Sequence, residues 1–271
     1  MNTPRMILKM SAVLATCAGA TVFGGVQIVA HRGASYDAPE NTIVSAKLAW
    51  ENNADAVELD IWLTKDGQLA VSHDGNTKRT AGHDATIASQ TLAEIRQLDA
   101  GSWKDPKFAG EKIPTLDEML ATLPPGRRIF IEIKTGPEGV PAMVASLERM
   151  HITAKQAVII SFNYESIKAS KKALPAYAAL LLVNRPSTDP KKKVPTLDEL
   201  IRDCRAAGLD GLDLNFNWPL DAAAVRKIKA AKLQLHVWTV DDPVVAKHWA
   251  DLGADGITTN RAGWLREQLS P

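Results

Sequence analysis

The chain has 271 residues, of which 45% are hydrophobic and 23% are charged, a composition typical of a globular protein and unlike that of a disordered, fibrous or collagen-like one. Its 32 basic and 31 acidic residues give a formal net charge of +1, which offers no electrostatic footprint for nucleic acids or anionic membranes. The length accommodates one large α/β domain or two small ones, and two cysteines are too few for a disulfide framework or a thiolate metal cluster.

The N-terminal segment has the layout of a secretory signal. Arg5 and Lys9 precede an uncharged apolar run over 11–25. This run is shorter than the about 20 residues that a transmembrane helix needs. We therefore predict a signal peptide over residues 1–20, with an end no later than residue 25.

Two routes of processing fit this segment. Ala18-Gly19-Ala20 supplies an A-x-A cleavage site for an exported protein, periplasmic or secreted. The alternative is a lipoprotein anchored at Cys17, although Thr16 stands where a lipobox normally has Gly or Ala. After cleavage of the signal we expect no stable insertion into a membrane.

From residue 26 onward, short apolar runs alternate with amphipathic stretches, which is typical of a parallel α/β architecture. The predicted strands are 26–30, 56–63, 69–72, 128–133, 157–161, 178–183, 211–214, 233–240 and 256–259. The predicted helices are 41–52, 115–123, 140–150, 164–174, 196–207, 222–231 and 243–252. This pattern predicts one (β/α)8 TIM barrel over residues 26–271 with one extended segment in excess.

The excess segment is explained by a hairpin. Lys65-Asp66-Gly67 contains the Asp-Gly pair that favours a tight turn, and the returning segment ends in His73. The period-two alternation of a strand places Glu58 and Asp60 on one face, so the hairpin brings an imidazole level with two carboxylates. We predict that this hairpin and a small insertion at about 75–111 follow the second barrel strand.

Charged side chains lie at the predicted strand ends. His31 and Arg32 follow the first strand, and Glu132 and Lys134 close the segment Ile131-Glu132-Ile133-Lys134. The carboxyl ends of barrel strands are where active sites are built. Because an unpaired charge in a buried strand costs several kcal/mol, this pattern predicts a compensating cation or substrate.

The carboxylates indicate the type of cation. Glu58, Asp60 and Glu132 form an all-oxygen ligand set without cysteine or a His-x-His pair. Such a set suits a hard divalent ion, Ca2+ or Mg2+, better than Zn2+.

These segments together resemble the glycerophosphodiester phosphodiesterase family, of the exported bacterial type. The resemblance spans nearly all of the chain after the signal, in the expected order. It rests on His31-Arg32-Gly33, Pro39-Glu40-Asn41-Thr42, Glu58-Leu59-Asp60, Thr64-Lys65-Asp66-Gly67, Ser72-His73-Asp74, Glu132-Ile133-Lys134, Leu98-Asp99-Ala100-Gly101-Ser102-Trp103, Phe108-Ala109-Gly110-Glu111, Ile113-Pro114-Thr115-Leu116, Val237-Trp238-Thr239-Val240 and Gly253-Ala254-Asp255-Gly256-Ile257.

The resemblance implies a barrel enzyme that uses a divalent cation, Ca2+ or Mg2+, to hydrolyse glycerophosphodiesters to glycerol 3-phosphate and an alcohol. The expected partner is a small glycerophosphodiester and no nucleic acid. By family resemblance the metal ligands are Glu58, Asp60 and Glu132, the general acid and base are His31 and His73, the phosphate-binding residues are Arg32 and Lys134, and the aromatic wall of the cleft is Trp238.

Further residues are candidates on position alone. Asn41 either reaches the site or caps the helix beside it. Asp213 and Asn215 lie at a strand end, and His236 precedes Trp238 by one pleat step. The chain departs from the family over 258–262, where an acidic residue and a proline are expected after the strand.

Two other functions fit the same barrel. A lyase-type phospholipase, sphingomyelinase D-like or phosphatidylinositol-specific, would cyclise a lipid phosphate, but it would need an apolar loop and the segment 75–111 is polar. A non-catalytic binding protein is disfavoured because both histidines and all three carboxylates are present.

Overall fold

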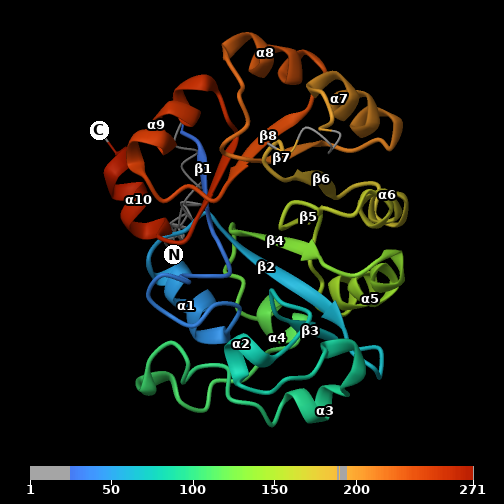
Figure 1. Ribbon diagram of the computed structural model, residues 1–271, viewed down its shortest axis with the longest axis vertical. Helices are drawn as coiled ribbons and strands as arrows, with labels where there is room; N and C mark the ends of the chain where they lie inside the picture. Colours follow the sequence, from blue (N-terminus) through green and yellow to red (C-terminus); the bar gives the residue numbers. More distant parts are fainter. Residues whose placement is uncertain (1–24, 188, 190–193, 271) are drawn as a thin grey trace, which may run out of the picture.

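The computed structural model describes residues 25–187, 189 and 194–270, and these form a TIM barrel (Figure 1). The predicted signal peptide over residues 1–20 lies outside the described residues. Within the described ranges, no helix is both long enough and apolar enough to cross a membrane.

Eight parallel strands close the barrel, as the sequence predicts. Strand β1 pairs in parallel with β9 on one side and with β2 on the other, which leaves no open edge in the ring. The barrel strands are β1 (Gln27–Ala30), β2 (Ala56–Leu63), β4 (Arg128–Ile133), β5 (Ala157–Ser161), β6 (Ala178–Val183), β7 (Gly211–Asn215), β8 (Gln234–Trp238) and β9 (Gly256–Thr259).

Helices surround the ring of strands (Figure 1). They are α1 (Ile43–Glu51), α4 (Leu116–Leu120), η3 (Pro137–Gly139), α5 (Val140–Arg149), α6 (Tyr164–Ala173), α7 (Leu197–Ala206), α8 (Ala222–Ala230), α9 (Pro243–Leu252) and α10 (Ala262–Leu269). The sequence pattern missed α10, because its N-cap Arg261 provides no side-chain capping bond and so leaves no start signal. It also extended β8 to residue 240, because Val240 is buried although it lies beyond the ladder.

Capping boxes set the starts of α1, α4 and α7, and those of α4 and α7 pair a Thr with a Glu. In α4 and α7, Thr115 and Thr196 accept from the backbone N–H three residues on, while Glu118 and Glu199 reach back to the cap. Each such cap contributes about 1 kcal/mol to helix stability. The two helices therefore begin with the same local structure.

The strands separate two apolar layers. Ile129, Ile131 and Ile133 of β4 face outward into the core beneath the helices, and Phe130 faces the barrel interior. This alternation directs Glu132 inward. The interior layer consists of Val29, Ala56, Phe130, Val158, Ile160, Leu180 and Leu182.

The predicted hairpin is also present. Strand β3 (Leu69–Val71) returns antiparallel to β2, with Ile61 opposite Val71. The insertion that follows lies beside α1 and α4 (Figure 1) and has its own small core, of which Ala70 and Ile87 are part. Its short helices are α2 (Lys78–Ala81), η1 (Ile87–Ser89), α3 (Leu92–Ile95) and η2 (Pro106–Phe108).

Candidate active site

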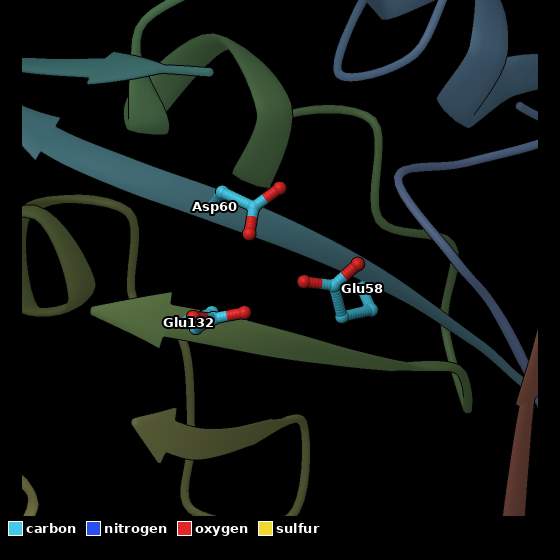
Figure 2. Close-up of side chains that lie close together, drawn as sticks. All are labelled: Glu58, Asp60 and Glu132. Carbon is cyan, nitrogen blue, oxygen red and sulfur yellow. The ribbon is translucent and has the colours of Figure 1, made fainter. Parts of the chain in front are cut away.

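Two adjacent barrel strands bring three carboxylates together. Glu58 and Asp60 project from β2 and Glu132 from β4, where Asp60 and Glu132 are neighbours in the strand register (Figure 2). All three side chains are buried, and each offers one oxygen within 4.8 Å of the others. The strand register and the pleat therefore produce the all-oxygen set that the sequence predicted.

The electrostatics of this set fit a divalent cation. Burial, and then repulsion by Asp60, raises the pKa of Glu132 to about 8. The same two causes, in the same order, raise the pKa of Glu58 well above its ordinary range. Burial alone would raise the pKa of Asp60 as well, but the Lys134 and Arg32 cations hold it below its ordinary value. A hard cation bound among the oxygens would remove this repulsion, so the donor set suits Ca2+ or Mg2+.

Lys134 neutralises part of the acidic charge. Its Nζ lies 2.7 Å from Glu132 Oε1 and 3.0 Å from Asp60 Oδ1. Although burial alone would lower it, these two carboxylates raise the pKa of Lys134. The ammonium therefore stays charged within the site.

The segment His31-Arg32-Gly33 forms a tight turn after β1. Arg32 has φ +56° and Gly33 has φ +79°, a region that favours glycine. A Cβ at Gly33 would lie 2.4 Å from Ser45 Oγ of α1, so only glycine fits beside this helix. The turn directs the Arg32 N–H to Glu58 Oε2 at 2.9 Å and its guanidinium to Glu40 at 2.9 Å.

Hydrogen bonds fix the tautomer of His31. Asn260 Nδ2 donates to Asp241 Oδ2 at 2.7 Å, because a carboxylate only accepts. The Asn260 Oδ1 therefore faces His31, and the His31 Nδ1–H donates to it at 2.7 Å. Burial, and then Arg32, lowers the pKa of His31 to about 4. His31 is thus neutral, and its Nε2 is the basic nitrogen.

His73 has a different partner. Its Nδ1 lies 2.8 Å from Asp74 Oδ1, and Trp62 Nε1 donates to its backbone oxygen at 3.2 Å. Burial lowers the pKa of His73, although Asp60 and the bond to Asp74 act in the opposite direction. The two imidazoles differ because one faces a neutral amide and the other a carboxylate.

The structure also settles the position of Asn41. Helix α1 has Thr42 as its N-cap, so Asn41 precedes the cap and does not serve as it. Its Nδ2 instead donates to Asp60 Oδ2 at 2.8 Å, from a backbone at φ +58°. Asn41 therefore holds a predicted metal ligand and lies behind it.

A cavity of about 200 Å³ joins these groups. It contains most of the predicted site residues, and Asp60 and Asn41 lie behind its wall. Its lining residues are His31, Arg32, Glu58, His73, Glu132, Lys134, Ile160, Phe162, Leu182, Asn184, Asp213, Trp238 and Thr258.

The far wall of the cavity contains residues that the sequence reasoning missed. Phe162 and Asn184 are the first residues after β5 and β6, so their place at the carboxyl end of a strand was the available signal. The Phe162 ring meets Trp238 edge to face, with centroids 5.4 Å apart. His236 lies inside the barrel but does not line the cavity, and its ring packs on Phe130.

The fold and the site together define a TIM-barrel phosphodiesterase with an acidic triad suited to a divalent cation. The comparison with known families agrees, because residues 31–263 match the model of the "Glycerophosphoryl diester phosphodiesterase family". The chain belongs to this family.

Relatives of this family cover most of the chain. A glycerophosphodiester phosphodiesterase of Bacillus subtilis (strain 168) is 34% identical over 86% of this chain and 82% of its own length. One from Caldanaerobacter subterraneus subsp. tengcongensis is also 34% identical, over 86% of this chain and 93% of its own.

Solved structures resemble the fold closely. A phosphodiesterase of Oleispira antarctica, in complex with the product sn-glycerol-3-phosphate, has a TM-score of 0.81 at 28% identity and covers 91% of this chain and 97% of its own. A glycerophosphodiester phosphodiesterase of Agrobacterium tumefaciens has a TM-score of 0.73 at 26% identity. The match covers 89% of this chain and 99% of the Agrobacterium chain.

Proposed function

We propose that the chain hydrolyses glycerophosphodiesters to glycerol 3-phosphate and an alcohol, with one divalent cation, Ca2+ or Mg2+. The observation that carries the proposal is the joint lining of one cavity by His31, His73 and the carboxylates of Glu58 and Glu132. Within this cavity a phosphate can contact acid, base and cation at once.

The charge balance of the site supports a phosphodiester as substrate. Three acids, Glu58, Asp60 and Glu132, face the two permanent cations Arg32 and Lys134. A divalent cation on the triad would make the site net positive and would neutralise charge on the phosphate oxygens. Arg32 and Lys134 would hold the remaining non-bridging oxygens.

The histidines divide the proton transfers. His31 Nε2 accepts a proton from the attacking water, whose oxygen forms the new bond to phosphorus, because the His31 Nδ1–H is engaged by Asn260. As the bond from phosphorus to the alcohol oxygen breaks, His73 donates a proton to that oxygen, and Asp74 stabilises its imidazolium form. We accordingly assign His31 as base and His73 as acid.

One assay tests the reaction and its cation. Purified protein is incubated with glycerophosphocholine and with glycerophosphoethanolamine, and glycerol 3-phosphate release is measured with EDTA and after re-addition of Ca2+ or Mg2+. We expect chelation to abolish turnover and one of the two ions to restore it. Glu132→Gln should weaken metal binding, whereas Glu148→Gln, on the exposed side of α5, should not.

The outcomes are distinct. Full turnover in excess EDTA, with no metal in the protein, contradicts the metal requirement. Accumulation of a cyclic phosphate without glycerol 3-phosphate indicates the lyase-type reaction. Absence of any product with either ion contradicts the enzymatic function.

We also propose export, on the basis of Arg5, Lys9 and the apolar run that follows them. The mature N-terminus should lie near Thr21. Terminal sequencing of protein from the cell envelope and the medium tests both statements: an intact Met1 contradicts export, and a lipid-modified Cys17 contradicts cleavage near Thr21.

A further inference from the structure

Asp213 occupies a position in the cavity that the proposed proton transfers do not use. It lies on β7, which is four strands from β2 around the closed ring, so it faces the metal triad from the opposite wall. Its side chain is 2% exposed and lines the same cavity as Glu58 and Glu132.

The Asp213 carboxyl has no partner within the part of the chain that the structure describes. Its Oδ1 receives no hydrogen bond, and no Lys or Arg side chain of the described ranges forms an ion pair with it. Its strand neighbours are Leu182 on β6 and His236 on β8. Burial alone raises the pKa of Asp213 to about 8. A buried carboxyl without a partner is unusual in folded proteins and lowers their stability, so a ligand group is the natural partner.

The chemistry of that ligand group follows from the site. The proposed phosphate-binding cations Arg32 and Lys134 lie on the other wall with the acidic triad, so Asp213 faces another part of the substrate. A quaternary ammonium carries no N–H and would leave Oδ1 without a hydrogen bond. A hydroxyl both donates and accepts, so it satisfies the carboxyl in either protonation state.

We propose that Asp213 binds a free hydroxyl of the glycerol moiety and thereby selects glycerol esters over other phosphodiesters. This inference rests on the proposed function and adds a specificity residue to it. A diester without the hydroxyl would leave Asp213 buried and unpaired, and sites built to bind a hydroxyl reject such analogues strongly.

The test compares substrates that differ in one feature at a time. Glycerophosphocholine and glycerophosphoethanolamine share the glycerol and differ in the head group. Propyl phosphocholine keeps the head group and replaces both free glycerol hydroxyls with hydrogen. The values of kcat/KM are measured for the wild type, for Asp213→Leu, which removes the hydrogen bond, and for Asp213→Asn, which keeps a donor and an acceptor at the same volume.

The wild type should prefer glycerophosphocholine over propyl phosphocholine by at least about tenfold. In Asp213→Leu this preference should fall about 10-fold to 100-fold, as expected for one hydrogen bond to a carboxyl group. The loss should be equal for both glycerol esters, and the propyl ester should be turned over at an unchanged or higher rate. Asp213→Asn should retain a larger part of the preference than Asp213→Leu.

Other results overturn the inference. A preference that changes less than twofold, or an equal loss on all three substrates in protein with an unchanged Tm, shows that Asp213 binds no hydroxyl. A loss confined to glycerophosphocholine shows that Asp213 recognises the head group. If Asp213→Leu does not fold, the same comparison is made with Asp213→Ala, which removes the carboxyl without adding apolar bulk, and an unchanged preference in that variant overturns the inference. Failure of the wild type to hydrolyse glycerophosphocholine overturns the proposed function itself.

Discussion

At the scale of single residues, His31 and His73 differ in the group that faces their Nδ1 atoms, an amide oxygen for His31 and a carboxylate for His73. His31 donates to an amide oxygen that is in turn held by Asp241. The family pattern predicts an acidic residue and a proline over 258–262, and this chain has neither in that segment. Asn260 gives His31 a neutral acceptor, and the bond from Asn260 to Asp241 fixes its orientation.

Replacement of Asn260 tests this role. Asn260→Leu has a similar volume but frees the His31 Nδ1–H, so the ring loses its fixed tautomer and orientation. We expect kcat to fall about 10-fold to 100-fold with KM nearly unchanged, as for other groups that orient a reacting side chain. Ser35→Ala is the matched control, because it removes only the hydroxyl that also donates to Asn260 Oδ1 at 3.0 Å. Equal losses in the two variants would mean that the orientation of Asn260 does not matter.

The division of labour between the histidines gives a second prediction. His31→Ala and His73→Ala should each lower kcat by about 10² to 10⁴ on glycerophosphocholine, and the double variant should lose far less than the product of the two factors. An aryl phosphodiester has a leaving group that needs no proton. It should therefore rescue His73→Ala and not His31→Ala in steady-state assays. The opposite pattern of rescue would reverse the assignment, and losses of only a few-fold would make both residues structural.

At the scale of elements, the hairpin and the insertion that follows it position His73, one of the two proposed proton-transfer residues. Helix α2 is too short to be stable by itself, but Arg79 ties it to the barrel. Its Nε donates to Asp74 at 2.6 Å and its NH groups donate to Glu40, which also pairs with Arg32. A chain of charged groups thus connects Arg32 after β1 with His73 after β3.

Arg79→Gln should loosen this connection. Asp74 loses its cation and holds the His73 ring less firmly, so we expect kcat to fall by up to about tenfold. Lys78→Gln is the neighbouring control, since Lys78 pairs with the exposed Asp84 only at the rim of the insertion and exposed pairs contribute about 0–1 kcal/mol. The comparison is made by measuring kcat and Tm for both variants. A similar loss in Lys78→Gln would indicate a general weakening of the insertion.

At the scale of the whole molecule, the barrel closes around carboxylates that repel one another. The folded pKa of Glu132 is about 8, above its ordinary value of 4.5. A carboxyl shifted in this direction contributes its stability below its unfolded pKa, and the contribution is lost as pH rises through the folded pKa. Ion binding acts in the opposite direction, because it requires ionised carboxylates.

We therefore expect the Tm of the protein in EDTA to fall as pH rises from about 5 to about 8. The increase in Tm on addition of Ca2+ or Mg2+ should grow over the same range. Glu132→Gln should flatten the slope in EDTA, and Glu148→Gln should leave it unchanged. Thermal unfolding at several pH values measures all three. A metal-free Tm that rises with pH, or an equal slope in Glu132→Gln, would show that the triad does not control stability.

The sequence by itself determined the architecture and the chemical inventory of the site. Strand periodicity, the Asp66-Gly67 turn and the capping boxes are local signals, because each depends on residues within one turn or pleat of the next. The same locality placed Glu58 and Asp60 on one face of β2 and Glu132 inward on β4. The family motifs added the ordered set of charged residues around them.

Only the tertiary structure decided how these groups act on one another. The bond from His31 to Asn260 joins residues 229 positions apart, and the bond from Asn41 to Asp60 replaces a helix cap that the sequence allowed equally. The isolation of Asp213 depends on burial between two neighbouring strands, β6 and β8, which no local pattern records. Hydrogen-bond partners, tautomers and pKa shifts result from charges and burial across the closed barrel, so they appear only when the ring of strands is complete.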